Sequence, residues 1–229
     1  MGNAFFQQPM FGVSLTLIVY AIAQGLHKKW SKLHPLFITS TGIIAILLIC
    51  GIPYESYRVG GDYIALLLGP ATVGLGVPLY KQTRSIGRNL PAILAGLTTG
   101  SISALVCAGG ITWSLGAAKN IWVTMIPKSV TTPISVEIVR HLGGIPELGV
   151  IVTTLTGLIG SMIGPELLRL CGVRADIAIG TAIGTASHGI GTARLVKESE
   201  LQAGVSGFAM AATGIFISLL VIPLYWILQ

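Results

Sequence analysis

Apolar residues in this chain occur in long runs separated by short polar breaks. The runs cover residues 11–26, 36–52, 63–80, 90–113, 148–171, 175–195 and 203–228. A run of about 17–25 apolar residues is long enough to cross the hydrocarbon core of a bilayer as a helix. The pattern therefore predicts an all-α polytopic membrane protein.

The composition supports a membrane protein. Of 229 residues, 52% are hydrophobic and only 10% are charged, whereas soluble domains carry about 25% charged residues. The net charge of +6 is spread over short loops, with no basic stripe of the kind that binds nucleic acid. The three cysteines Cys50, Cys107 and Cys171 lie in or beside apolar runs. We expect them to be small buried hydrophobes rather than disulfide or metal ligands.

Basic residues predict the orientation of the chain. Lys28, Lys29 and Lys32 follow the first run, and Lys81, Arg84 and Arg88 follow the third. Such clusters are retained in the cytoplasm. We therefore expect the less basic loop 54–62, and the N-terminus, to face outward.

The chain matches itself at an offset of 115 residues. Segments 39–44, 69–76 and 98–105 align without gaps on 154–159, 184–191 and 213–220. We expect two membrane repeats, 1–115 and 116–229, within one integral domain. Inverted repeats would place Arg169 and Arg174 inside, but they require an odd number of crossings in each half. We favour inverted repeats, and parallel repeats stay open.

One run in each repeat is interrupted by glycine and proline, namely 69–78 and 184–193. Interrupted helices in corresponding positions are typical of secondary transporters, where they form the binding site. In the second, Gly189 and Gly191 permit a positive φ, and we expect Thr192 to cap a second half-helix. Val77-Pro78 would begin the matching half-helix in the first repeat.

The stretch 127–133 predicts another half-helix. Pro133 suits the first turn of a helix and Thr131 or Thr132 suits its N-cap, so we expect a helix that runs to about His141. Its N-terminus would point into the protein and attract an anion. Lys128 lies just before it, and a lysine at membrane depth costs at least about 2.5 kcal/mol and usually marks a pathway or a charge partner. The alternatives are that Lys128 pairs with Glu137 or extends to the membrane interface.

These features define a hypothetical site for a small anionic solute. The expected binding residues are Lys128, Thr131 and Thr132 on one side, Ser187, His188, Gly189, Gly191 and Thr192 on the other, and Arg194, Gly69 and Thr72 at the edges, with Thr185 as a further hydroxyl. His188 either carries a coupling proton, binds the anion, or is only structural. Glu137 is the second candidate for proton coupling.

Other polar residues have structural explanations. Arg194 either binds carboxylate or lies in the loop before Glu198 and Glu200. Glu137, Arg140, His141 and Glu147 suggest an ion-pair or gating cluster, and the spacing of Gly180 and Gly184 suggests helix packing. No arrangement of nucleophile, base and orienting group stands out, so we expect neither an enzyme nor a cofactor or metal site.

Several motifs resemble a known family. Pro127-Lys128-Ser129-Val130-Thr131-Thr132-Pro133, Gly143-Gly144-Ile145-Pro146, Ala186-Ser187-His188-Gly189-Ile190-Gly191-Thr192-Ala193, Gly69-Pro70-Ala71-Thr72 and Pro78-Leu79-Tyr80 closely resemble the LrgB/CidB family of membrane proteins. The similarity covers nearly the whole chain.

The resemblance implies a multi-pass protein of the bacterial inner membrane, with two different functions. Bacterial members were named antiholin- or holin-like modulators of murein hydrolase export and cell lysis. Others are similar to plastid glycolate/glycerate translocators, or to pyruvate uptake systems that work with a small LrgA/CidA-type membrane partner. Because a holin has no need of paired broken helices, the residues favour transport of small 2-hydroxy or 2-oxo monocarboxylates by alternating access. We also expect contact with membrane lipid, and a homodimer formed through the Gly/Ala-rich runs 90–113 and 203–228.

Overall fold

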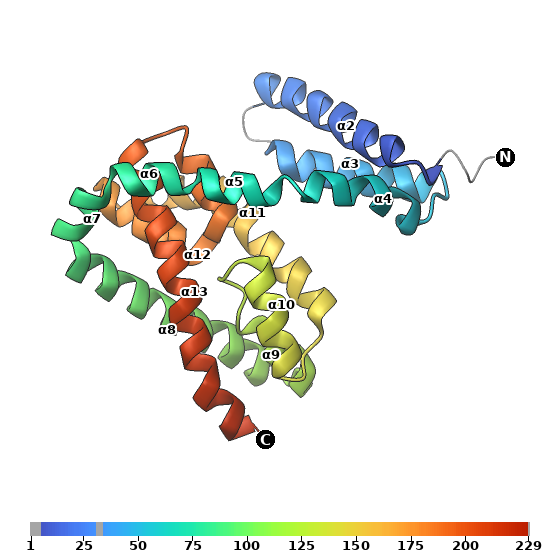
Figure 1. Cartoon of the computed structure of the whole chain (residues 1–229). Coiled ribbons are helices and arrows are strands. Elements are labelled where there is room, and N and C mark those ends of the chain that lie inside the picture. The colour runs from blue at the N-terminus through green and yellow to red at the C-terminus, as the bar shows by residue number, and fades with distance from the viewer. Residues whose placement is uncertain (1–5, 31–33, 229) are drawn as a thin grey trace. The chain divides into compact units, whose positions relative to one another are not determined.

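The helices follow the apolar pattern of the sequence. A computed structural model describes residues 6–30 and 34–228, within which every regular element is a helix. In chain order these are α2 Pro9–Lys29, α3 Pro35–Ile49, α4 Tyr54–Ala65, α5 Leu68–Gly74, α6 Gly76–Lys81, α7 Thr83–Arg88, α8 Leu90–Ser114, α9 Lys119–Met125, α10 Thr132–His141, α11 Pro146–Leu170, α12 Asp176–Leu195 and α13 Glu200–Leu228 (Figure 1). The all-α prediction is confirmed. Lys32 of the first basic cluster lies outside the described residues.

Five stretches within the described residues are long and apolar enough to cross a membrane. They are 9–29, 54–81, 90–114, 146–170 and 200–226. Many large apolar side chains on them are exposed, for example Leu17, Val106 and Ile215. The cysteines are exposed as well, so the prediction that they are buried was wrong. The reason is that lipid is as apolar as the protein interior, so an apolar residue is not driven inward.

The chain forms two compact units, Met1–Gly74 and Leu75–Gln229. In the first unit, α2 and α4 cross in close backbone contact at Gly12 and Gly60. A Cβ added at Gly12 would lie 2.5 Å from the Tyr57 carbonyl oxygen, and one at Gly60 would lie 2.6 Å from Gly12 Cα. Glycine is therefore required at this crossing. The proposed division into repeats 1–115 and 116–229 stays a prediction.

The first interrupted run is only mildly broken. Turns at 66–67 and 75 separate α4, α5 and α6, and the N-cap of α6, Leu75, keeps helical angles (φ −67°, ψ −17°). A half-helix starting near Pro78 was expected, and α6 begins at Gly76. Gly69 lies inside α5 instead of forming the break.

In the second unit, α12 packs against α8, α11 and α13. Its partner α11 presents a row of glycines: Gly164 faces Ile183, Gly160 faces Ser187 and Gly157 faces the His188 ring. A Cβ at Gly157 would lie 2.6 Å from His188 Cε1. The row makes the groove into which α12 fits.

On its other side α12 meets α13 equally closely. A Cβ at Gly180 would lie 2.7 Å from the Gln202 carbonyl oxygen, and one at Gly184 would clash with the backbone of Ser206. This confirms the prediction that Gly180 and Gly184 serve helix packing.

The helix α12 reverses direction at His188, where φ is 41° and ψ is −137°. Before the break, successive residues of α12 face earlier and earlier residues of α11: Ile183 faces Gly164, and His188 faces Gly157. After the break, Arg194 returns to the Ser161 and Met162 carbonyls, and a Cβ at Gly191 would lie 2.7 Å from Ile183 Cγ2. Residues 176–187 and 189–195 thus lie side by side as a helical hairpin, the α12 hairpin, with its tip at His188.

The prediction of a broken helix in this stretch is confirmed, with two corrections. The positive φ is at His188, and neither Gly189 nor Gly191 has one. Gly191 is instead required for close contact between the two arms of the hairpin. Both ends of the run 175–195 also lie near the same end of α11, since Ile179 and Leu195 pack in one cluster with Leu168, so we expect this run to enter the membrane and return instead of crossing it.

The hairpin brings charged residues to one end of the second unit. Arg169 in the last turn of α11 pairs with Glu198 after the hairpin, and Lys81 at the end of α6 pairs with Glu200 at 2.7 Å. Within the second unit, Lys81, which is expected in the cytoplasm, therefore lies at the same end as the later basic residue Arg169, in agreement with retention of Lys and Arg on that side.

The hairpin predicts that loops 171–175 and 196–199 are on the same side of the membrane. We expect an impermeant maleimide to label Cys171 in a Cys50→Ser/Cys107→Ser protein, and Lys197→Cys in a protein with all three native cysteines replaced by serine, from the same side. Labelling is compared in right-side-out and inside-out vesicles. Labelling from opposite sides would mean that α12 spans the bilayer.

The glycine groove predicts that Gly157→Ala is destabilising, because its new Cβ meets the His188 ring. We expect a cost of about 1–3 kcal/mol, typical of overpacking, seen as a lower Tm in detergent. Gly110→Ala in α8 is the matched control, because nothing lies within 4 Å of its added Cβ. Equal Tm values for the two variants would contradict the packing assigned to α12.

Candidate functional site

The half-helix predicted after Lys128 is α10. Its N-cap is Thr131 (φ −65°, ψ 149°), a proline occupies its first turn, and it ends at His141, followed by Gly143 with φ 72°. The predicted bounds are confirmed. The Thr131 hydroxyl makes no capping hydrogen bond, so the backbone angles and Pro133 define the start of the helix.

The first turn of α10, the middle of α11 and the tip of the α12 hairpin meet in a buried chain of hydrogen bonds. The Thr153 hydroxyl donates to Ser135 Oγ at 2.9 Å, and His188 Nε2 lies 3.0 Å from the Thr153 carbonyl oxygen. All three side chains are at most 4% exposed. Because a carbonyl only accepts, Nε2 carries a hydrogen in this bond. We call these three residues the central junction.

The two helices that meet at the junction arrive from opposite ends of α11. The α10 helix runs beside the start of α11, where a Cβ at Gly149 would lie 3.2 Å from Val139 Cγ2. The first arm of the α12 hairpin runs from Gly164 toward Gly157. The α10 helix begins near Thr153, and the first arm of the hairpin ends near it, close to the middle of α11. The N-termini of α10 and of arm 189–195 therefore lie near one another.

A second pair of buried hydroxyls, those of Thr192 and Ser206, connects the tip of the α12 hairpin to α13. Thr192 Oγ1 donates to the His188 carbonyl at 2.8 Å and lies 2.8 Å from Ser206 Oγ of α13. Thr192 is thus inside the second arm, and the prediction that it caps that arm was wrong. A threonine hydroxyl within a helix commonly bonds the carbonyl four residues earlier, and here this bond holds the tip against α13.

Lys128 lies half-buried in the loop between α9 and α10. Its ammonium approaches Ser129 Oγ at 3.4 Å. Glu137 is exposed and pairs with Arg140 at 2.7 Å and with His141 at 3.5 Å. Among the described residues, Lys128 thus has no carboxylate partner within 4.0 Å, and the Lys128–Glu137 pair is not formed.

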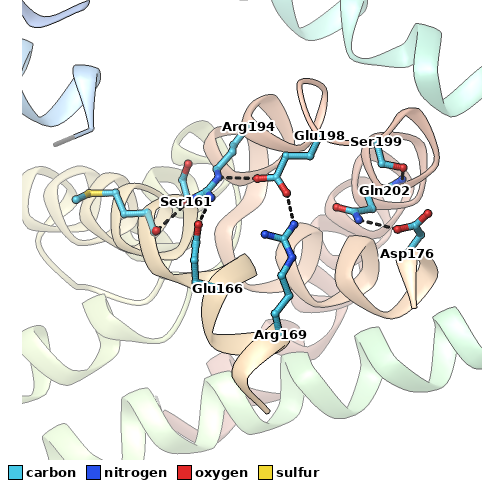
Figure 2. A network of polar contacts seen from close by, with 9 residues as sticks. Ser161, Glu166, Arg169, Asp176, Arg194, Glu198, Ser199 and Gln202 are labelled. Carbon is cyan, nitrogen blue, oxygen red and sulfur yellow. Dashed lines mark hydrogen bonds and ion pairs between the residues drawn. The ribbon is translucent and has the colours of Figure 1, made fainter. Parts of the chain in front are cut away.

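Arg194 belongs to a network of polar contacts (Figure 2). Its guanidinium binds Glu166, Glu198 at 3.0 Å, and the carbonyl oxygens of Ser161 and Met162. Pro165 lies inside α11 and has no N–H for the Ser161 carbonyl, so Arg194 supplies the missing donor. Arg194 therefore attaches the second arm of the α12 hairpin to α11. It lies in the last turn of α12 and not in the loop before Glu198 and Glu200, where the alternative interpretation placed it.

The remaining residues of the sequence-based site are in different surroundings. Ser187 is buried against Gly160 of α11, and Gly189 lies at the tip beside Met210 Sδ of α13, 3.7 Å from its added Cβ. Thr131 and Thr132 are half-buried at the start of α10. Gly69 and Thr72 belong to the first unit and are exposed, with the Thr72 hydroxyl donating to the Leu68 carbonyl at 2.7 Å.

Two residues of the central junction, Ser135 and Thr153, were not predicted from the sequence, and neither was Ser206, the partner of Thr192. Each is a hydroxyl residue within a helix, and such residues normally satisfy themselves on their own backbone. Thr153 is followed by Thr154 and Thr156, and no local signal distinguishes it from them. Thr153 differs from them only through its contacts with other helices, in which it bonds Ser135 and His188.

Comparisons with known proteins agree with this architecture. A model of the LrgB-like family matches residues 16–227. The uncharacterized protein YxaC of Bacillus subtilis is 34% identical over 94% of this chain and 96% of its own length. The holin-like protein CidB of Staphylococcus aureus (strain Mu50) is 35% identical over 93% of this chain and 94% of its own. No solved structure matches the chain. With five apolar helices and relatives of this kind, the chain is a multi-pass bacterial membrane protein that belongs to the LrgB-like family.

Proposed function

We propose that this protein is a secondary transporter of small 2-hydroxy or 2-oxo monocarboxylates, such as glycolate, glycerate or pyruvate. The observation that carries the proposal is the meeting of two half-helices at the central junction. Transporters commonly place their substrate where discontinuous helices end near the middle of the bilayer.

The charge at this place favours an anion. Helix N-termini carry a partial positive charge and unpaired N–H groups, and that of α10 is directed toward the interior. Lys128 adds a full positive charge close to this terminus, and no described carboxylate neutralises it. A lysine kept in such surroundings is usually functional. A single carboxylate of a small acid would balance one lysine.

The arrangement also suits alternating access. The α12 hairpin is fastened at one end by Arg194 and Glu198, and α10 reaches the junction from the opposite end. In the described conformation His188 is only 4% exposed, so the junction is closed to solvent. Movement of either element would open the junction to one side only.

A second candidate function comes from the relatives. CidB of Staphylococcus aureus carries the name holin-like protein and is 35% identical. Modulation of murein hydrolase export and cell lysis, or work as a structural subunit with a small LrgA/CidA-type membrane partner, is therefore the alternative. A homodimer stays a prediction for either function.

Transport predicts that Lys128 is required. We expect reconstituted Lys128→Ala protein to take up labelled glycolate or pyruvate at least about 10-fold more slowly than wild type, because a charged hydrogen bond to a carboxylate is worth about 1.5–3 kcal/mol. Lys119→Ala, at the exposed start of α9, is the matched control. Wild-type rates in a folded, monodisperse Lys128→Ala protein would overturn the proposed site, and a change in lysis after deletion, with no solute uptake, would favour the holin-like function.

The two roles of His188 predict different results for two variants. Because φ at this position is 41°, a conformation that costs of order 1–3 kcal/mol for most residues, we expect His188→Gly to have a higher Tm than His188→Ala. If the ring binds the solute or its proton, both variants lose uptake. If the ring only maintains the reversal of α12 through Thr153, we expect His188→Gly to keep more uptake than His188→Ala. The ratio of the two uptake rates therefore distinguishes solute binding from a structural role.

A further inference from the structure

Three buried hydroxyls in the second unit have no hydrogen-bond partner among the described residues. They are Ser101 in α8, Thr185 in the α12 hairpin and Thr213 in α13, with exposures of 0%, 5% and 0%. A buried donor left unpaired costs about 1–3 kcal/mol. Three such groups in neighbouring helices therefore call for an explanation.

Other hydroxyls of the same helices are satisfied by their own backbone. Thr98 in α8 donates to the Leu94 carbonyl at 2.8 Å, Thr181 in α12 to the Ile177 carbonyl at 2.7 Å, and Ser218 in α13 to the Gly214 carbonyl at 2.8 Å. Back-bonding is thus available in each helix. The three unpartnered hydroxyls differ from these in making no hydrogen bond to their own backbone.

The packing of α8, α12 and α13 places the three hydroxyls at a similar height along these helices. Thr185 Cγ2 lies 3.2 Å from a Cβ added at Gly100, the neighbour of Ser101. The helices α8 and α13 run parallel, because the earlier residues Ile93 and Val205 share one cluster, and the later residues Leu105 and Ile217 share another. Ser101 and Thr213 each lie between these two levels.

This level is next to the central junction. On α13, Met210 lies beside the hairpin tip, with its Sδ 3.7 Å from a Cβ added at Gly189. One turn further on, a Cβ added at Gly214 would lie 3.0 Å from Ile134 Cδ1 in the first turn of α10. Thr213 is therefore placed between the tip of the α12 hairpin and the start of α10.

We propose that Ser101, Thr185 and Thr213 form a hydroxyl subsite that binds the 2-hydroxy or 2-oxo oxygen of the transported acid. This inference rests on the proposed function, in which Lys128 and the start of α10 bind the carboxylate. The second oxygen of such an acid is on the adjacent carbon, so it requires polar partners close to the carboxylate site. A serine or threonine hydroxyl both donates and accepts, and therefore recognises a hydroxyl and a keto oxygen alike.

The surroundings argue against a cation at this subsite. Cations need several oxygen ligands with negative charge nearby. Within the described chain, no group of three His, Cys, Asp or Glu residues lies close enough to hold a metal. A neutral polar group of the substrate fits three uncharged hydroxyls better.

The subsite is tested by discrimination between acids with and without the second oxygen. Uptake of labelled glycolate into proteoliposomes is measured in competition with unlabelled glycolate or acetate, and the ratio of their inhibition constants is compared for wild type, Thr213→Val and Thr185→Val. We expect wild type to prefer glycolate, and each variant to lose that preference by about 5- to 50-fold, because a buried polar site rejects an acid that leaves its groups unpaired. Inhibition by acetate should change little.

Control variants separate this role from general damage. Thr98→Val and Thr181→Val remove back-bonded hydroxyls of the same helices and should keep the preference. Thr213→Ser restores a hydroxyl without the methyl group and should also keep it. Unchanged discrimination in Thr213→Val and Thr185→Val, or an equal loss in the controls, would overturn the subsite.

Two further outcomes distinguish failure of the proposed transport function from failure of the hydroxyl subsite. Wild-type protein that takes up neither acid would overturn the proposed function and the subsite with it. Glycolate uptake that depends on Lys128, together with unchanged discrimination in the threonine variants, would overturn the subsite alone. Replacing sodium with potassium in the same assay adds one more check, since an effect of Thr213→Val that appears only as altered sodium dependence would assign the hydroxyls to a cation instead.

Discussion

The reversal of α12 at His188 is the constraint on which the second unit depends. A residue with φ 41° is strained unless its surroundings hold it, and here the imidazole donates to the Thr153 carbonyl while the Thr192 hydroxyl bonds the His188 carbonyl. Gly157 of α11 leaves the room that the ring occupies. One side chain thus links the break to the middle of α11.

The hairpin has consequences at both of its ends. At the base, Arg194 donates to the Ser161 carbonyl, which Pro165 cannot reach with an N–H, so a proline in one helix becomes the attachment point of another. At the tip, polar backbone and hydroxyl groups are buried beside the middle of α11, a helix long and apolar enough to cross a membrane. Such groups are tolerated there only where protein or a cavity satisfies them, which is why the tip, α10 and the middle of α11 are found together.

Membership of the LrgB-like family establishes the class of protein, whereas the structure shows which helices meet inside it. The family and the relatives establish a multi-pass bacterial membrane protein, and the name holin-like protein is that of the CidB relatives. The structure contributes the buried contact of α10 and the α12 hairpin at the middle of α11. The proposal of a carrier for small acids is based on this contact.

The sequence by itself determined the all-α membrane fold, the bounds of α10 and the existence of a break near His188. Long apolar runs, Pro133 and the Gly-rich stretch are local signals, and local signals suffice for them. It did not determine the direction of the chain after the break, the role of Arg194 or the choice of Ser135 and Thr153 as junction residues. Those depend on contacts between residues far apart in the chain, such as His188 with Thr153. Only the packing of α12 against the glycine groove of α11 decided them, because hydroxyl-bearing helical residues look alike until a neighbour offers a partner.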